Sequence, residues 1–312
     1  MAAILTKQAE YRKHYPDSPA DLLSRSSNGI SVWTAVAKEA QTHKDEILEV
    51  FAEIGTALDH PVQLAGFQAT LQAILDDSLA RFQPEQIDVE FTAIAYARYL
   101  PPQREWTNRF GQRHSFDDLA DVLASRTLGW TVCYGTHVPY ALVTLLRVDE
   151  QVPILSPLRR RLARQRLAEV SRLLVRTQYK NGAWGPDWWN DAPGPGGASE
   201  NPNPEVSVSN FIRATGHHLE WIALAPKDLR PPDANVEKAA QWVVSTTLAQ
   251  PQGILSTYYG EFSHGARALL LLSGSKPFPR ATRFVSEPSQ QHAEGEARAA
   301  GGSPSHSGAE FQ

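Results

Sequence analysis

The chain has 312 residues, 42% hydrophobic and 21% charged, enough to bury one large core. Thirty Lys and Arg residues stand against 34 Asp and Glu, and the dense basic run lies only at 159–166, which argues against nucleic-acid binding through phosphate contacts. The single cysteine, Cys133, excludes a disulfide framework and zinc patterns built on two or four thiolates. Any metal would therefore rely mainly on histidine and carboxylate ligands.

The N-terminal segment, residues 1–23, carries Lys7, Glu10 and Arg12 among its charged residues, so it has no apolar core of signal-peptide length. The longest apolar runs, such as 268–272, are far shorter than the ~20 residues that span a bilayer. We therefore expect a cytoplasmic protein without a transmembrane segment.

Apolar side chains recur at helical spacing through most of the chain, and strand-like alternation is scarce. Prolines such as Pro61, Pro84 and Pro153 stand at the edges of these runs, where helices begin or end. The pattern predicts an all-α fold with helices over 32–58, 64–82, 89–99, 116–124, 137–146, 158–178, 206–224, 235–248 and 263–272.

Two segments differ from this pattern. Gly, Ala, Ser and Pro make up about half of residues 276–312, too little apolar surface to offset the entropy of ordering, so we predict a disordered tail after a single domain, 1–275. Residues 190–205 read as a long Gly- and Pro-rich loop. Such a loop is either a lid or a surface insertion, and both interpretations stay open.

Three segments share a glycine, a nearby histidine, a polar residue three positions after it, and an Ala- and Leu-rich continuation. We interpret them as the starts of buried inner helices. Because residues at i and i+3 share a helix face, the spacing predicts these pairs: His137 with Tyr140, His217 with Glu220, and His264 with Arg267. If the helix N-termini meet, their free N–H groups favour an anionic or oxygen-rich ligand. The alternative is three separate structural histidines.

A histidine beside a carboxylate is a tunable acid/base pair, so His217 with Glu220 is the predicted catalytic pair, and Arg267 is expected to hold an anionic group. We expect His217 rather than His218 to face inward. The predicted catalytic residues are His217, Glu220, His137 and His264. The predicted ligand-binding residues are Tyr140, Arg267, Trp184, Asp187 and Trp188. The sequence assigns no cofactor and no metal ligand, although a three-histidine metal site stays an alternative.

The long amphipathic helix ends in Gln178-Tyr-Lys-Asn-Gly182-Ala-Trp184. Gly182 permits a left-handed turn, Trp184 can cover the helix end, and Gln178 can bond its free backbone groups. This Q-x-x-x-G-x-W motif resembles the repeat of the squalene cyclase and protein prenyltransferase superfamily. The resemblance implies an α/α toroid, a layered ring of inner and outer helices.

The resemblance does not extend to the chemistry of that superfamily. Asp76-Asp77 is only a fragment of the cyclase D-x-D-D motif, and a solvated pair on a helix face explains it better. The prenyltransferases hold zinc with Asp, Cys and His; Cys133 and Asp187 could join a histidine in such a set, but no spacing supports it. Trp188, like Trp189, either stacks on a ligand or covers helix ends. Fold alone carries no activity.

A shorter segment, Gly216-His-His-Leu-Glu220-Trp221, resembles part of the N-acylglucosamine and cellobiose 2-epimerases, which are also α/α barrels with an acid/base histidine. Three functions therefore stay open. The first is a toroid protein that binds or transforms a small molecule in a histidine-lined cavity by acid/base chemistry. The second is a carbohydrate epimerase-like enzyme, and the third is a helical scaffold for protein partners.

Overall fold

The computed structural model describes residues 2–33, 43–102, 105–190 and 207–274. The predicted tail, 276–312, and the loop beyond residue 190 lie outside these ranges. The described part is mostly helical with little sheet, which agrees with the all-α prediction. None of its helices is both long and apolar enough to cross a membrane.

The α-helices in the described ranges are α1 (Ala2–Thr6), α2 (Gln8–His14), α3 (Glu46–Glu53), α4 (Leu71–Arg81), α5 (Val89–Tyr99), α6 (Phe116–Ser125), α7 (His137–Gln151), α8 (Pro157–Thr177), α9 (Val208–Leu224), α10 (Asp233–Leu248), α11 (Gln252–Thr257) and α12 (Tyr259–Leu272). The strands form three antiparallel hairpins, β1 (Leu23–Arg25) with β2 (Ile30–Val32), β3 (Pro61–Leu64) with β4 (Phe67–Thr70), and β5 (Trp106–Thr107) with β6 (Arg113–His114).

The predicted helices agree with these elements from α5 onward, and they fail in the N-terminal third. The predicted helix 64–82 begins as strand, because Leu64 pairs with Phe67 across a tight turn in which Gly66 has φ +68°. The helix itself, α4, begins only at Leu71. Of the predicted helix 32–58, Val32 ends strand β2 and α3 is the only helix among the described residues. The helices α1, α2 and α11 were not predicted.

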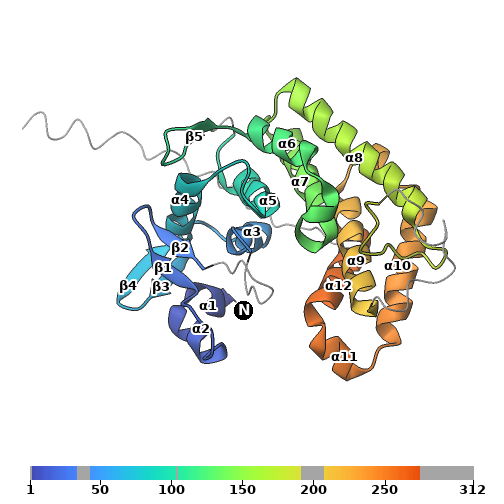
Figure 1. Cartoon of the computed structure of the whole chain (residues 1–312), viewed down its shortest axis with the longest axis horizontal. Helices are drawn as coiled ribbons and strands as arrows, with labels where there is room; N and C mark the ends of the chain where they lie inside the picture. The colour runs from blue at the N-terminus through green and yellow to red at the C-terminus, as the bar shows by residue number, and fades with distance from the viewer. Residues whose placement is uncertain (1, 34–42, 103–104, 191–206, 275–312) are drawn as a thin grey trace, which may run out of the picture.

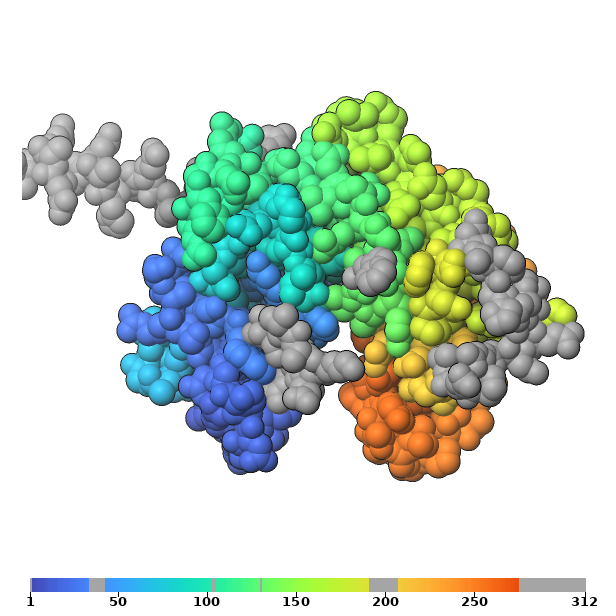
Figure 2. All heavy atoms as spheres, viewed as in Figure 1, coloured from blue at the N-terminus to red at the C-terminus, as the bar shows by residue number. Residues whose placement is uncertain are grey.

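Five helices form a curved row in which each packs against the next: α3, α5, α7, α9 and α12. The helices α6 and α8 pack against α7, and α10 packs against α9, on the outer side of the row (Figure 1). Buried apolar side chains form one cluster from α2 to α12. Figure 2 shows the molecule hollowed between the N-terminal elements, in blue, and the C-terminal helices, in orange.

The end of α8 is fixed as the Q-x-x-x-G-x-W motif predicts. The Gln178 side-chain amide donates to the Gly182 carbonyl at 2.9 Å and to the Asn235 carbonyl at 2.8 Å, which ties α8 to the start of α10. The Trp184 Nε1 donates to the Leu174 carbonyl at 2.9 Å, and Gly182 has φ +102°. The predicted roles of Gly182 and Trp184 are confirmed, whereas Gln178 bonds the Gly182 carbonyl and α10 rather than the free backbone groups of α8.

Two glycines let α9 and α12 approach closely. A Cβ on Gly216 would lie 2.8 Å from the Gly265 backbone nitrogen and 3.0 Å from the His264 carbonyl carbon. A side chain cannot fit between backbones at that distance. The contact brings the middle of α9 against the second turn of α12, and it sets the positions of the histidines on both helices.

Candidate functional site

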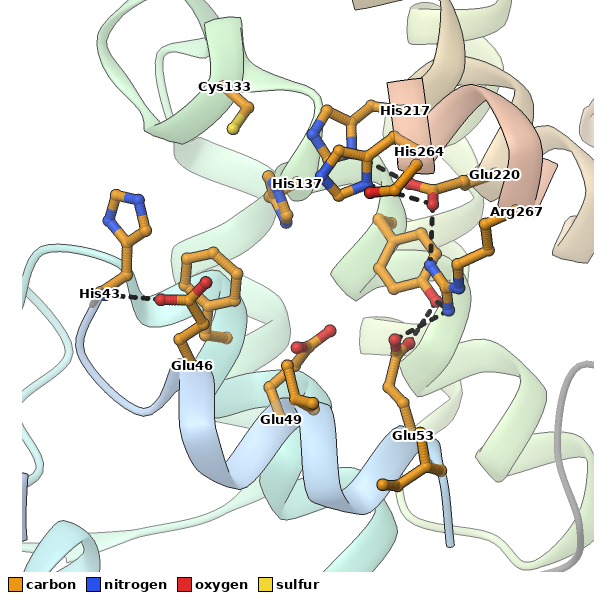
Figure 3. Close-up of a pocket in the computed structure, with 15 residues that line it drawn as sticks. His43, Glu46, Glu49, Glu53, Cys133, His137, His217, Glu220, His264 and Arg267 are labelled. Atoms are coloured by element: carbon orange, nitrogen blue, oxygen red, sulfur yellow. Dashed lines mark hydrogen bonds and ion pairs between the residues drawn. The ribbon is translucent and has the colours of Figure 1, made fainter. Parts of the chain in front are cut away.

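A cavity of about 650 Å³ lies inside the curved row, between α3 and α5 on one side and α7, α9 and α12 on the other (Figure 3). Six of the predicted site residues line it: His137, Tyr140, His217, Glu220, His264 and Arg267. The structure therefore brings the three predicted histidine pairs to one place. As expected, His217 rather than His218 faces the cavity.

The histidines do not all begin helices, which corrects the predicted pattern of helix starts. His137 is the first residue of α7, whereas His217 lies in the middle of α9, far from its first residue, Val208. His264 follows the first turn of α12. Gly216 thus marks a close contact between helices rather than a helix end, so the predicted cluster of positive helix N-termini around a ligand is wrong for α9.

The three imidazole rings lie next to one another. The ring centroids of His137 and His217 are 4.6 Å apart, and those of His217 and His264 are 3.7 Å apart. On its other side His137 contacts Phe91 of α5, with centroids 4.7 Å apart. This row of rings forms one wall of the cavity.

Glu220 joins two of these histidines to Arg267. Its Oε2 accepts a hydrogen bond from His217 Nδ1 at 2.9 Å, and its Oε1 accepts from His264 Nδ1 at 3.3 Å and from Arg267 Nη1 at 3.0 Å. Burial opposes ionisation of Glu220, but electrostatic attraction to the neighbouring His264 and the hydrogen bonds from His217 and His264 hold its pKa well below the usual range. Glu220 is therefore an ionised carboxylate shared by two imidazoles.

Arg267 also spans the cavity. Its Nη2 donates to Glu53 Oε2 of α3 and to the Tyr140 hydroxyl of α7, both at 2.7 Å, and the Tyr140 hydroxyl donates in turn to Glu53. The last helix of the row is thus linked to the first through polar side chains. Arg267 already forms ion pairs with Glu53 and Glu220. These pairs weigh against the prediction that Arg267 holds an anionic group of a ligand.

Two ring nitrogens on the histidine wall are buried and have no hydrogen-bond partner among the described residues: His217 Nε2 and His137 Nδ1. Burial and the neighbouring His264 lower the pKa of His217 to about 4. Burial, with His217 and His264 nearby, also holds the pKa of His137 well below its usual value. Both imidazoles are therefore neutral at pH 7. The bond from His217 Nδ1 to Glu220 leaves the lone pair of His217 on Nε2, where a ligand can use it.

Cys133 lies beside these rings at the edge of the cavity (Figure 3). Its backbone is left-handed, with φ 48°, and so is that of Tyr134, with φ 62°, a conformation that costs about 1–3 kcal/mol in a residue other than glycine. Trp188 supports this turn, because its Nε1 donates to the Tyr134 carbonyl at 2.7 Å. Burial raises the pKa of the Cys133 thiol to about 12.

The other predicted ligand-binding residues do not line the cavity. Trp184 and Trp188 are fully buried against the ring of His218, with centroids 5.6 Å and 4.4 Å away, and Trp221 Nε1 donates to His218 Nδ1. Asp187 is exposed. The tryptophans thus cover helix ends and the far side of α9, which is the structural alternative that the sequence left open.

Sequence reasoning missed the opposite wall, which is acidic. Glu46, Glu49 and Glu53 lie on one face of α3 and point into the cavity (Figure 3). Their spacing of three and four residues within an otherwise apolar helix is the signal that could have found them. Glu49 is only 6% exposed, and burial, together with the charge of Glu53, raises its pKa well above the usual value.

Within the described residues, two groups of three side chains have donor atoms close enough to share a metal ion. The groups are Cys133 with His137 and His217, and His217 with Glu220 and His264; in each, the donor atoms lie within 4.8 Å of one another. The predicted alternative of three histidines is not one of these groups. Asp187 belongs to neither, so the Asp, Cys and His set of the prenyltransferases has no counterpart around Cys133.

Comparisons with models of protein families, with curated protein sequences and with solved structures gave no match for this chain. The resemblances to the squalene cyclase and prenyltransferase superfamily and to the 2-epimerases therefore stay predictions from short motifs.

Proposed function

We propose that the protein is an enzyme that binds a small polar molecule in this cavity and exchanges a proton with it through the histidines on Glu220. One observation carries the proposal: side chains from α3, α7, α9 and α12, far apart in the sequence, converge on a single cavity of about 650 Å³. That volume is typical of small-molecule sites, and buried ionisable groups gathered in a cavity are typical of active sites.

The lining favours a neutral or positively charged substrate. Four carboxylates, those of Glu46, Glu49, Glu53 and Glu220, face the cavity with one guanidinium, that of Arg267. An anionic group such as a diphosphate would meet like charge. A hydrocarbon would bury the ionisable side chains without compensating hydrogen bonds. We therefore infer a substrate rich in hydroxyl or amino groups rather than an isoprenoid diphosphate.

His264 is the best placed group for proton exchange. Its side chain is 35% exposed, against 4% for His217, so a bound molecule can reach it. The bond from its Nδ1 to Glu220 orients the ring and leaves Nε2 for the substrate. The ionised carboxylate stabilises the imidazolium that forms when His264 takes up a proton. His217, which is bonded to the other oxygen of Glu220, is buried too deeply to exchange a proton with a bound molecule as readily.

The polar lining also supports a carbohydrate reaction as the second candidate, because sugars are uncharged and rich in hydroxyl groups. The epimerase-like segment supplies His217 and Glu220 to the cavity, although the predicted tryptophan platforms lie elsewhere. The three histidines lie next to one another in the cavity. This weighs against a non-catalytic scaffold, for which three separate structural histidines were predicted.

The finer predictions about fold and compartment are likewise proposals. The curved row of helices with α6, α8 and α10 outside it supports a toroid arrangement. The free thiol of Cys133 is compatible with a reducing cytoplasm.

A ligand screen tests the proposed function. The melting temperature of the protein would be measured with monosaccharides, amino sugars, polyamines, sugar phosphates and prenyl diphosphates. A ligand at 100 times its Kd stabilises by ~2.7 kcal/mol, or roughly 5 °C for a domain of this size. We expect neutral or cationic compounds to stabilise the wild type and to lose most of this effect with His264→Ala.

The matched control is His14→Ala, which removes an exposed histidine remote from the cavity and should respond as the wild type does. Stabilisation by prenyl diphosphates alone, or equal stabilisation of His264→Ala, would contradict the proposal.

A further inference from the structure

We propose that Cys133, His137 and His217 bind a divalent metal ion of the zinc type in the wall of the cavity. The three side chains come from η2 (Val132–Gly135), from the first residue of α7 and from the middle of α9. They nevertheless present a sulfur and two nitrogens within 4.8 Å of one another. Figure 3 shows His217 directed toward Cys133, with His137 beside them.

The unpartnered nitrogens are the first observation that points to a ligand. His217 is 3% exposed and His137 is 9% exposed, and each keeps a buried ring nitrogen without a hydrogen-bond partner among the described residues. Buried polar atoms in folded proteins are nearly always satisfied. Two such atoms on adjoining rings, next to the only thiol of the chain, are accounted for together if the rings and the thiol hold an ion.

The contact between His217 and Glu220 is the second observation. His217 Nδ1 donates to Glu220 Oε2 at 2.9 Å, which fixes the tautomer and leaves the Nε2 lone pair free. A metal-binding histidine usually donates its other ring N–H to a carboxylate or carbonyl, which orients the ring and increases its basicity. Glu220 has this position relative to the proposed ion.

The backbone at Cys133 is the third observation. Cys133 and Tyr134 are both left-handed, and the turn is held by Trp188 on Tyr134 and by Thr136, whose hydroxyl donates to the Cys133 carbonyl at 2.8 Å. Strained conformations persist where the surrounding structure enforces them, and they cluster at functional sites. Here the enforced turn presents the thiol beside His137, four residues later in the chain.

The donor set selects the type of ion. Imidazole and thiolate suit zinc and similar transition metals, whereas magnesium and calcium require oxygen ligands. The Cys133 thiol, protonated in the free protein, releases its proton to solvent when its sulfur binds the ion. With bonds of about 2.0–2.3 Å, the donors of a tetrahedral site are roughly 3.3–3.7 Å apart, so binding requires side-chain shifts of about an ångström. Three protein ligands leave a fourth position for water or for a bound molecule.

The second group of donors is less suitable. In His217, Glu220 and His264 the carboxylate oxygens already accept hydrogen bonds from both rings, and Glu220 Oε1 also accepts from Arg267. An ion there would have to displace these bonds. The metal proposal thus uses the cavity of the proposed function without depending on it, because His264 and Glu220 keep their roles when His217 Nε2 is occupied.

Titration of the untagged, metal-free protein with Co²⁺ and Zn²⁺ tests the site. We expect one ion per chain and a cobalt–sulfur charge-transfer absorption, which can come only from Cys133 because the chain has no other cysteine. Cys133→Ala should abolish the band and weaken zinc binding at least 100-fold. Glu220→Gln should keep the band and weaken zinc binding about 10- to 100-fold, as loss of a partner to a metal ligand does.

His14→Ala is the control and should bind both ions as the wild type does. A second measurement uses only the wild type: one equivalent of Zn²⁺ should slow alkylation of Cys133 by iodoacetamide at least tenfold. The proposal is overturned by absence of stoichiometric binding, by a cobalt spectrum without the sulfur band, or by zinc affinity unchanged in Cys133→Ala. The metal titration contains no small molecule, so its failure does not affect the outcome of the ligand screen. Likewise, failure of the ligand screen does not affect the metal proposal.

Discussion

The two walls of the cavity differ in chemistry and in how they are held. The α3 wall carries Glu46, Glu49 and Glu53, whereas the opposite wall carries three adjoining histidines on α7, α9 and α12. The histidine wall is fixed by backbone contact, since Gly216 and Gly265 let α9 meet α12. The acidic wall is attached to it by side chains, through the bonds of Arg267 to Glu53 and Tyr140. Close backbone contact therefore holds one side of the cavity, and side-chain electrostatics couple the other side to it in addition to the packing of α3 on α5.

The largest effect is expected from cutting the link between the walls. Arg267→Met leaves Glu53 and Glu220 facing the cavity without their shared cation. We expect the free energy of unfolding to fall by roughly 2–4 kcal/mol, less than for a fully buried pair because solvent reaches the guanidinium. Urea denaturation measures it. Arg172→Met, at an exposed arginine, is the control, and equal losses in both variants would refute the coupling.

The histidine wall is tested next, at the glycine contact. Gly216→Ala puts a Cβ 2.8 Å from the Gly265 backbone, so it should separate α9 from α12 and cost about 1–3 kcal/mol. Gly253→Ala, in α11 with open space around its Cβ, should be neutral or stabilising by up to ~1 kcal/mol through helix propensity. Thermal unfolding of both variants shows whether steric crowding between α9 and α12 outweighs the higher helix propensity of alanine. A stabilised Gly216→Ala would show that the contact is not tight.

Trp188→Phe sharpens the account of the turn that carries Cys133. The change removes the hydrogen bond from Nε1 to the Tyr134 carbonyl and should cost about 1 kcal/mol. Because the left-handed turn loses a support, we also expect faster alkylation of Cys133 in the metal-free protein. An alkylation rate equal to that of the wild type, measured by mass spectrometry, would mean that Trp188 does not hold the thiol.

The smallest effect is expected on the acidic wall, and it depends on pH. The folded pKa of Glu49 lies above its unfolded value, so its contribution to stability is full below about pH 4.3 and is lost as the pH rises through the folded pKa. Glu49→Gln lacks this loss. It should therefore become more stable relative to the wild type as the pH rises, by about 1 kcal/mol or less. Urea denaturation from pH 4 to pH 8 measures the trend, and a trend of opposite sign would refute a raised pKa of the buried Glu49 carboxyl.

The sequence predicted the histidine wall because its signal is local. The pairs His137 with Tyr140 and His217 with Glu220 follow from spacing along one helix, and both pairs line the cavity. What failed was the meaning of Gly216. A glycine near a histidine suggests a helix boundary, and only the packing of α12 shows that it marks a close contact inside a helix.

The acidic wall and the position of the cysteine were not predicted, because what sets them apart depends largely on tertiary structure. Glu46, Glu49 and Glu53 have the spacing of an ordinary solvated face, and they face inward because α3 packs on α5 at the start of the row. From the sequence alone, Cys133 is indistinguishable from a small buried core residue. Its left-handed backbone and its position beside His217 come from the turn that Trp188 supports, 55 residues away in the sequence.

The central claim is that a ligand binds between the two walls, and histidine NMR tests it most directly. Spectra of ¹⁵N-histidine-labelled protein would be recorded with and without the best stabilising compound from the screen, with residues assigned by substitution. The account predicts that the ring signals of His264 and His137 shift while those of His14 and His114, outside the cavity, do not. Shifts confined to His14 or His114, with the cavity histidines unchanged, would contradict it.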